Sequence, residues 1–431
     1  MADKKNDKKK LILYSNYYYP EVASLAQLCT DLCVGLADRL DITVICSIPC
    51  YTGEIEDRYL IKKYYYETYD GVDVIRVRVP RFDKQKKLSR VKNILAYFFR
   101  SIWITFKAPK ADYILTESQP PVLGGLLGVA GKWVNRLRGK KSKMFYVIQD
   151  YNPEQTIATG YSKNQLVLKL LMFLDKFSCR RADKVIVVGR DLIETLKNRF
   201  KNKKVPPYAF INNWIDENQI YPLTKADSKV AAFCKENGLD DKFVFMYSGN
   251  LGLFYDLENL LKMVHELPKP LRTPDGREVA FVFIGAGSIK DKLVQYKEEN
   301  HMDNVYFIPY QDKELLNYSL NAADVHWCVS AKGICGVSVP SKLYGQIATG
   351  KPVFAVLEKG AEAQLIIEET NCGLVCEPCD YAQMKENLQW FIDHANDPVL
   401  DEMGARGREY LVQHLTKDIS LQHYYETIIN T

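Results

Sequence analysis

The sequence lacks the features by which membrane-spanning and secreted proteins are identified. Its longest uncharged stretch, at 118–131, is shorter than the ~20 mostly apolar residues that a transmembrane helix needs. The lysine-rich first ten residues lead directly into a predicted strand, without the apolar region and small-residue cleavage site of a signal peptide. We therefore expect a cytoplasmic protein.

The sequence also has few candidate metal ligands and only a small net charge. There are only 6 histidines, and none completes a four-ligand zinc site with the neighbouring Cys372, Cys376 and Cys379. We expect the 11 cysteines to be reduced and mostly buried, and we expect no metal and no bound cofactor. The net charge of +5 is too small to require a nucleic-acid partner.

What the sequence does contain is a regular alternation of short β-rich runs and helix-length segments along its 431 residues. Several of the runs are apolar on both faces, as strands of a parallel sheet covered by helices must be. The pattern predicts an α/β protein with two doubly wound, Rossmann-like domains that face each other. The predicted strands are 11–16, 42–47, 72–77, 113–118, 143–150, 184–189, 208–213, 242–249, 279–287, 305–309, 324–330, 352–357 and 373–378.

The boundary between the two domains is predicted in a polar, proline-marked connection at 212–223. We place the first domain at 1–215 and the second at 216–408. The segment from about 409 to 431 has a helical pattern, and we expect it to pack back on the first domain.

The segment 84–110 is basic and amphipathic, with eight Lys or Arg and no acid. Its apolar side chains, which include Phe98, Phe99 and Trp103, recur at three- and four-residue steps and leave cations such as Arg100 outside the apolar face. Such a helix can lie in the headgroup layer of an anionic membrane. The alternative is a core helix whose outer face happens to be basic.

Three glycine-containing turns follow predicted strands of the second domain, at 248–252, 285–288 and 333–350. Ligands of open α/β sheets bind beyond the carboxyl ends of strands, and glycine lets backbone N–H groups approach a phosphate. In the third turn, Ser341 and Lys342 would place a hydroxyl and a cation at a helix N-terminus. The turns together predict a nucleotide site, although the third could also be an ordinary capped helix with a solvated lysine.

Several segments, taken in order, resemble the family 4 glycosyltransferases, which have the GT-B fold. The segments are SNYYYPEVASLAQLCTDLCVGLADRLDITVICSIPCYTG, DYILTESQPP, VIQDYNPE, KVIVVGRDLIETL, FINNWID, MYSGNLGLFYDLENLL, FVFIGAGSIKDKL, VYFIPYQDKELLNYSLNAADV and SVPSKLYGQIATGKPVFAV. The resemblance covers nearly the whole chain and is closest to enzymes that build bacterial capsule, O-antigen or colanic-acid repeat units.

This resemblance implies retaining, metal-independent transfer of a hexose or N-acetylhexosamine-type sugar in the cleft between the two domains. We expect a UDP-linked sugar as donor and a polyprenyl-diphosphate-linked glycan as acceptor. The enzyme would then lie at the inner face of the cell membrane, held there by the basic segment 84–110.

The resemblance also assigns residues to the donor site. Gly249 and Asn250 match the family's diphosphate turn. Gly285 and Gly287 match the turn that closes the base pocket, and Ile308 matches the floor of that pocket.

The loop and helix start beneath the donor are matched by Ser338, Ser341 and Lys342. Many family members carry two glutamates here, but the matching positions are Val337 and Gly345. Because the family's usual cations after the diphosphate turn are also missing, Lys342 becomes the main candidate counter-charge for the leaving diphosphate.

For the acceptor side, the resemblance places the segment from Tyr18 to Ser24 over the donor phosphates. It places the turn of Gln149 and Asp150 beside the acceptor and the transferred sugar, shortly before Glu154. Asp150 could accept a hydrogen bond from the acceptor hydroxyl or act as its base, and it could equally cap the next turn.

Two other functions compete with sugar transfer. A nucleotide-sugar epimerase would release an epimer without any acceptor. A catalytically degenerate subunit would bind a nucleotide or lipid without turnover, and the missing glutamates favour it.

Overall fold

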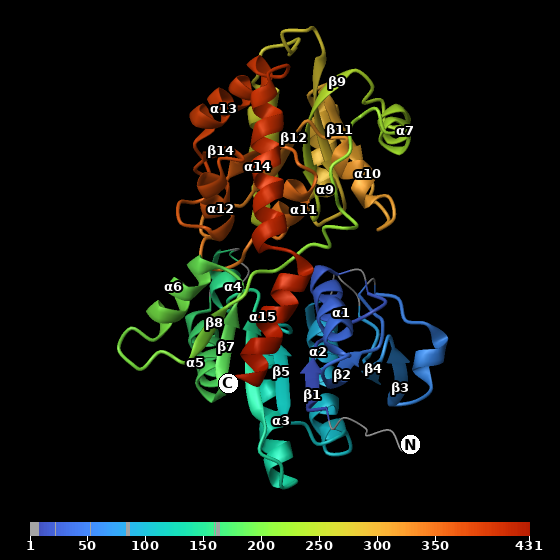
Figure 1. Ribbon diagram of the computed structural model, residues 1–431, viewed down its shortest axis with the longest axis vertical. Helices are drawn as coiled ribbons and strands as arrows, with labels where there is room; N and C mark the ends of the chain where they lie inside the picture. Colours follow the sequence, from blue (N-terminus) through green and yellow to red (C-terminus); the bar gives the residue numbers. More distant parts are fainter. Residues whose placement is uncertain (1–7, 22, 52, 83–86, 159, 161–163) are drawn as a thin grey trace. The chain divides into compact units, whose positions relative to one another are not determined.

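The computed structural model describes residues 8–21, 23–51, 53–82, 87–158, 160 and 164–431. By its internal contacts the chain divides into two units (Figure 1). Unit 1 consists of 1–188, 192–212 and 420–431, and unit 2 consists of 189–191 and 213–419. The units are described separately below.

Unit 1 is built on an eight-stranded sheet in the order β3-β4-β2-β1-β5-β6-β7-β8. All neighbours are parallel except β3, which pairs with β4 in the antiparallel sense. The strand order reverses between β1 and β5, which makes their carboxyl ends the topological switch point of the sheet. The strands are β1 (Lys10–Tyr14), β2 (Asp41–Ser47), β3 (Tyr64–Tyr69), β4 (Val72–Val77), β5 (Tyr113–Glu117), β6 (Lys143–Ile148), β7 (Lys184–Val187) and β8 (Tyr208–Phe210).

Helices cover both faces of this sheet, as adjacent residues of β5 show. Glu117 contacts Cys29 on one face, whereas Thr116 bonds to Gly124 on the other, because successive strand residues point to opposite sides. The first face carries α1 and α15, and the second carries α2, α3 and α5. The helices are α1 (Ser24–Leu36), α2 (Lys87–Thr105), α3 (Leu123–Leu137), α4 (Glu154–Ala158), α5 (Gln165–Arg181), α6 (Arg190–Arg199) and α15 (Lys417–Ile429).

Unit 2 is built on a six-stranded parallel sheet in the order β11-β10-β9-β12-β13-β14. Here the order reverses between β9 and β12. The strands are β9 (Lys242–Ser248), β10 (Glu278–Ile284), β11 (Val305–Ile308), β12 (Val325–Val329), β13 (Val353–Val356) and β14 (Gly373–Cys376). The helices are α7 (Ser228–Glu236), α8 (Leu257–His265), α9 (Lys290–Glu299), α10 (Leu316–Asn321), α11 (Lys342–Ala348), α12 (Glu362–Thr370), α13 (Tyr381–Asp393) and α14 (Pro398–His414), with a short 3-10 turn at Leu253–Tyr255.

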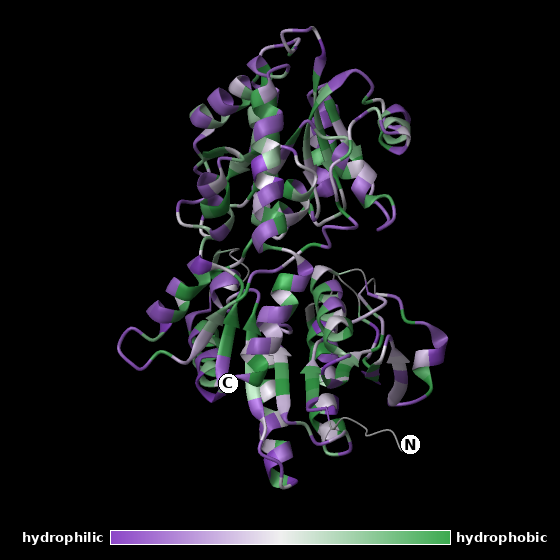
Figure 2. Ribbon diagram, viewed as in Figure 1, coloured by the Kyte–Doolittle hydropathy of each residue, from purple (hydrophilic) through white to green (hydrophobic). Residues whose placement is uncertain are grey.

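The predicted α/β class with two doubly wound sheets is confirmed. The central strands of both sheets are apolar on both faces and buried, and they are mostly green in Figure 2. Aromatic residues fill the core of unit 2, where Trp327 stacks on Phe281 and Phe354. No helix among the described residues is long and apolar enough to cross a membrane.

The structure differs from the expectation at two elements. β3 was not predicted, because its sequence YYYETY alternates half-buried and exposed residues at the sheet edge. The single helix expected at about 409–431 is two helices, since α14 ends at His414 and α15 begins at Lys417. Between them, Thr416 forms a β-bridge with Ile215 in place of a helical turn.

Candidate functional site

Two glycine turns of unit 2 lie in contact at the carboxyl ends of β9 and β10. The N–H of Gly249 donates to the carbonyl of Ile284 at 2.9 Å, and the N–H of Leu251 donates to Ala286 at 2.9 Å. A Cβ at Gly285 would lie 2.0 Å from the Gly249 carbonyl oxygen, and φ of Gly285 is +142°. Only glycine fits this approach, because a side chain would collide with backbone that the sheet holds in place.

Lys342 reaches this pair of turns from the start of α11. A Cβ at Gly249 would lie 2.5 Å from Cε of Lys342, so the lysine side chain crosses directly over the first turn. Its Nζ lies 3.3 Å from the ring centroid of Tyr255 and 5.1 Å from that of Tyr247. No ion pair joins Lys342 to a carboxylate in the part of the chain that the structure describes. The arrangement places a cation beside glycine backbone, as a diphosphate requires.

The other predicted donor residues differ in their exposure and in their hydrogen bonds near the two turns. Asn250 is exposed, and its carbonyl accepts a hydrogen bond from the Tyr247 hydroxyl at 2.7 Å. Gly287 is exposed at the end of the second turn. Ile308 is buried in the core, so only its backbone, which accepts from the N–H of Gly285, touches the turns.

The loop before α11 carries the two predicted serines. Ser341 is the N-cap residue of α11, but its side chain makes no capping hydrogen bond. Ser338 is half-buried, and its N–H donates to the Ile334 carbonyl at 3.3 Å. At Gly345, the position of the family's second glutamate, a Cβ would make an ordinary contact with Leu320 at 3.7 Å. The side-chain amide of Gln346 is turned inward and donates to the Trp327 carbonyl.

The sequence analysis missed a carboxylate at this edge of the sheet. Oε2 of Glu358 accepts hydrogen bonds from the N–H groups of Gly333, Ile334 and Cys335 at 2.8, 3.0 and 3.0 Å. Three consecutive N–H groups aimed at one oxygen form an anion-binding nest. Glu358 lies 23 to 25 residues from these N–H groups in the sequence, so no local sequence pattern indicates the contact.

In unit 1, the ends of β5 and β6 bring together the predicted acceptor residues Gln149 and Asp150. The N–H groups of both donate to the Ser118 hydroxyl, at 3.2 and 3.4 Å. Both side chains are half-buried at the carboxyl edge of the sheet. A carboxylate in this position is reachable by a ligand that lies beyond the strand ends.

A second carboxylate, Glu117, lies one residue before Ser118 and was not predicted. It is fully buried, and burial raises its pKa to about 8, although a weak hydrogen bond from Cys29 opposes the shift. Glu117 is therefore neutral over much of the physiological range.

The remaining acceptor-side residues differ in their surroundings. Glu154 accepts hydrogen bonds from both Nε and a terminal nitrogen of the buried Arg199, which also bonds to Asp175. Tyr18 is completely buried, so its side chain is not accessible to a ligand in this structure. Ser24 is exposed at the first position of α1. Their roles toward a ligand stay predictions.

The predicted membrane segment is α2, apart from its first residues, which lie outside the described part of the chain. Phe99 and Trp103 are each 63% exposed. Phe98 is half-buried against the Phe99 ring, and Arg100 is half-buried with its guanidinium bonded to the Arg78 carbonyl. The exposed rings do not fit a core helix, which was the alternative interpretation of this segment.

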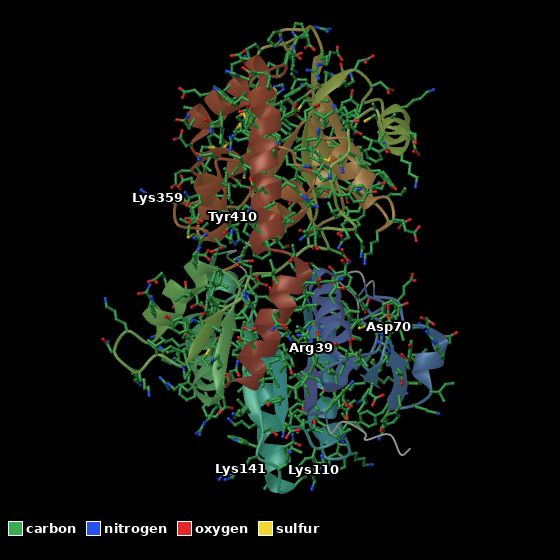
Figure 3. The ribbon with its side chains drawn as sticks, viewed as in Figure 1. Arg39, Asp70, Lys110, Lys141, Lys359 and Tyr410 are labelled. Carbon is green, nitrogen blue, oxygen red and sulfur yellow. The ribbon has the colours of Figure 1, made fainter. Side chains whose placement is uncertain are left out.

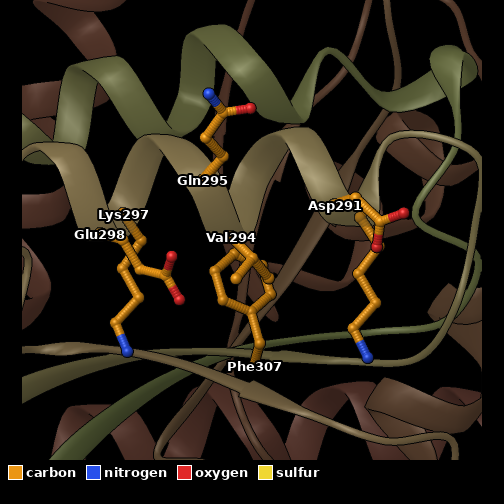
Figure 4. Close-up of a pocket in the computed structure, with 7 residues that line it drawn as sticks. Asp291, Val294, Gln295, Lys297, Glu298 and Phe307 are labelled. Atoms are coloured by element: carbon orange, nitrogen blue, oxygen red, sulfur yellow. The ribbon is translucent and has the colours of Figure 1, made fainter.

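A surface cavity of unit 2 lies away from the glycine turns. It has a volume of about 530 Å³ and lies between α9 and β11, lined by Lys290, Val294, Lys297 and Phe307 among others (Figure 4). None of the predicted site residues lines it. It is open to solvent, and the predicted donor residues lie at and around the glycine turns instead.

Comparison with known proteins identifies the family of this chain. Residues 229–410 match the family model of the group 1 glycosyl transferases. The chain is 30% identical over 366 residues to the probable glycosyltransferase WbjE of Pseudomonas aeruginosa, covering 82% of this chain and 84% of that one. It is 24% identical to the putative colanic acid biosynthesis glycosyl transferase WcaI of Escherichia coli K12, covering 97% and 99% of the two chains.

Solved structures show the same fold. Sucrose-phosphate synthase from Thermosynechococcus elongatus superposes with a TM-score of 0.73 at 15% identity, covering 98% of this chain and all of that one. HepE from Anabaena, solved with UDP and glucose, superposes with a TM-score of 0.69 at 14% identity and equal coverage.

Proposed function

The chain belongs to the group 1 glycosyl transferases and is a glycosyltransferase, and on this premise we propose a specific donor, acceptor and location for it. The proposed reaction is retaining, metal-independent transfer of a hexose or N-acetylhexosamine-type sugar from UDP to a lipid-linked glycan intermediate. The setting is the synthesis of a bacterial surface polysaccharide at the inner face of the membrane.

The observation that carries the donor assignment is the position of Lys342 over Gly249. When the bond between the sugar and the diphosphate breaks, negative charge develops on the leaving phosphate oxygens, and a preorganised cation with nearby N–H groups stabilises it. The placement of Lys342 fits a site in which this cation replaces a metal ion. UDP is proposed because HepE, which shares the fold, was solved with UDP and glucose.

The acceptor assignment rests on the relatives and on the edge of unit 1. WcaI is named for colanic acid biosynthesis, and the resemblance of this sequence to enzymes of such pathways implies a lipid-linked glycan as acceptor. We assign Asp150 to the acceptor hydroxyl, whose oxygen forms the new glycosidic bond while its proton leaves toward a carboxylate or phosphate oxygen. The exposed aromatic residues of α2 would hold the enzyme where that acceptor lies.

The test is an assay of sugar transfer from radiolabelled UDP-sugars to a polyprenyl-diphosphate-linked monosaccharide in detergent micelles. We expect labelled lipid with the native chain, strongly reduced product with Asp150→Asn and no free epimer. Release of an epimer without acceptor would show an epimerase instead. UDP binding without turnover on any lipid-linked acceptor would show the degenerate subunit.

A further inference from the structure

The two faces of unit 1 differ sharply in exposed apolar side chains. The helices α1 and α15, which cover one face of the sheet, have no exposed large hydrophobic residue along their described lengths. The helices of the other face carry many. They are Leu88, Val91, Leu95, Phe99 and Trp103 on α2, Trp133 and Leu137 on α3, and Leu166, Val167, Leu170 and Phe173 on α5.

In α2 an apolar stripe points outward, because polar groups occupy much of the inward stripe, next to the buried Ile104. Asn93 is buried and donates to the Pro80 carbonyl at 2.8 Å. Tyr97 is buried and donates to the Ile45 carbonyl at 3.1 Å, and Thr105 bonds to the Tyr14 hydroxyl at 2.7 Å. Hydrogen bonds thus help to hold α2 to the sheet, and much of its hydrophobic side is exposed.

α5 repeats this arrangement, and the sequence analysis did not anticipate it. Its inward side holds the polar residues Asp175 and Ser178, which are buried. Its outward side presents Leu166, Leu170 and Phe173, of which Leu166 is 79% exposed. The steps of four and three residues place these three side chains on one helical face.

α3 lies between α2 and α5 and joins their outward sides. It contacts both helices, and its Trp133 packs edge-on against Phe177 of α5, with ring centroids 6.2 Å apart. At its end, Arg138 donates to the carbonyls of Thr105 and Ala108, which lie at the end of α2. The exposed apolar residues of the three helices therefore belong to one surface, which we call the three-helix face.

The charge on the three-helix face has one sign. The cations of the three helices whose side chains the structure describes are Arg90, Lys92, Arg100, Lys132, Arg136, Lys169, Lys176, Arg180 and Arg181. The one carboxylate within the described helices is Asp175, which is buried and paired with Arg199. Two acidic residues close to these helices in the sequence form ion pairs, Asp112 with Lys140 and Asp183 with Lys132. Lys110 and Lys141 add exposed cations at the end of α3, as Figure 3 shows.

We propose that the three-helix face as a whole, with α5 and α3 as well as α2, docks on an anionic lipid bilayer. Apolar side chains from three helices would enter the boundary between headgroups and acyl chains, while the flanking cations contact lipid phosphates. A second copy of this chain fits the same surface poorly, because it would bring cations against cations. The proposal rests on the proposed function, in which the acceptor is embedded in a membrane, and extends it from one helix to a surface.

The experiment is flotation of the full chain with vesicles of phosphatidylcholine, with and without phosphatidylglycerol. The α5 variant is Leu166→Gln/Leu170→Gln/Phe173→Gln, with α2 left native. The matched control is Leu315→Gln/Val412→Gln, two exposed apolar residues of unit 2. We expect the native chain and the control to float with the anionic vesicles, and the α5 variant to lose at least ~10-fold in partitioning.

Two further measurements separate this proposal from the proposed function. The UDP-induced thermal shift of the α5 variant should equal that of the native chain, which shows that it is folded and that its donor site is intact. Brominated lipid should quench the fluorescence of Trp103 and Trp133 in the native chain. The quenching of the total tryptophan fluorescence should be smaller in the variant Trp103→Phe/Trp133→Phe. Native-like flotation of the α5 variant would overturn the role of α5. Binding to neutral vesicles as strong as binding to anionic vesicles would overturn the lipid assignment. So would a dimer of the native chain that is lost in the α5 variant.

Discussion

The ammonium group of Lys342 lies 3.3 Å from the centroid of the Tyr255 ring, although the two residues are far apart in the sequence. A cation in this position is attracted by the negative face of the ring. The contact holds Lys342 over Gly249 without a carboxylate, so the positive charge is kept for a bound anion.

Removing the cation should weaken nucleotide binding. A hydrogen bond to a charged group contributes about 1.5–3 kcal/mol, so Lys342→Ala should raise the Kd of UDP by roughly 10- to 150-fold. Isothermal titration calorimetry measures this directly. Lys332→Ala, which removes an exposed lysine of the preceding loop, is the matched control and should bind UDP normally. Equal affinity of the two variants would mean that Lys342 does not contact the diphosphate.

The aromatic ring of Tyr255 should matter more than its hydroxyl. Tyr255→Phe keeps the ring beneath Lys342 and should bind UDP like the native chain. Tyr255→Leu removes it and should raise the Kd by about 2- to 30-fold, as expected for a cation–π contact of about 0.5–2 kcal/mol. In the background of Lys342→Ala the two Tyr255 variants should bind alike. A difference that persists there would show that Tyr255 acts independently of Lys342.

The contact between the two glycine turns should be sensitive to a single methyl group. In Gly285→Ala the new Cβ would meet the Gly249 carbonyl oxygen at 2.0 Å, in addition to the strain of a positive φ. Gly276 also has a positive φ, of +89°, but a Cβ there meets nothing within 4 Å. Gly276→Ala should therefore cost about 1 kcal/mol and Gly285→Ala several times more. Thermal unfolding followed by circular dichroism measures both, and equal losses would contradict the close approach.

A carboxylate can be returned to the site at Gly345. A Cβ at this helical position meets only Leu320, at 3.7 Å, which is an ordinary contact. Gly345→Ala should stabilise the protein by up to about 1 kcal/mol, because glycine is unfavourable within a helix. If the matched family glutamate binds the ribose, Gly345→Glu should bind UDP more tightly than Gly345→Ala. Equal or weaker binding would show that the ribose is held in another way.

The sequence predicts the strands well, but it does not predict which residues that are distant in the chain come into contact. Every predicted strand is present, because a buried parallel strand needs an apolar run that is visible locally. The edge strand β3 was not predicted, because none of its residues is fully buried and Tyr66 and Thr68 face solvent. In α2, periodicity indicated an apolar face but not its direction, which depends on Asn93 and Tyr97 finding partners on the sheet. α5 was missed since its apolar residues are nearly continuous from Leu166 to Leu174.

The candidate sites show the same difference between features with a local sequence signal and contacts between distant residues. The glycine turns and Lys342 were found because glycine after a strand and a cation at a helix start are local signals. The pairing of Glu154 with Arg199 and of Glu358 with Gly333 joins residues separated by 45 and 25 positions. Such partners are fixed by the topology of the sheets, and a single sequence does not reveal them.

The buried carboxyl of Glu117 should make the stability of the chain depend on pH. Its pKa is raised to about 8 in the folded state from 4.5, so the folded chain keeps a proton that the unfolded chain has lost between these values. The free energy of unfolding should consequently fall as pH rises from about 4.5 to 8 and level off above. Cys29, Cys33 and Tyr424 interact electrostatically with Glu117 but do not contribute in this range, because burial raises the pKa of each further above it.

Substitution by glutamine isolates this effect. Glu117→Gln keeps the shape of the neutral carboxyl and cannot ionise, so its melting temperature should match the native value near pH 5 and exceed it increasingly toward pH 8. Melting temperatures measured at half-unit steps of pH give both curves, with the exposed Glu402→Gln as the control that should follow the native curve. A Glu117→Gln chain that is less stable than native at every pH would show that the carboxyl is ionised and bound to a partner in the fold. The sign of the difference at pH 8 therefore decides whether the switch point of the first sheet holds a proton or a charge.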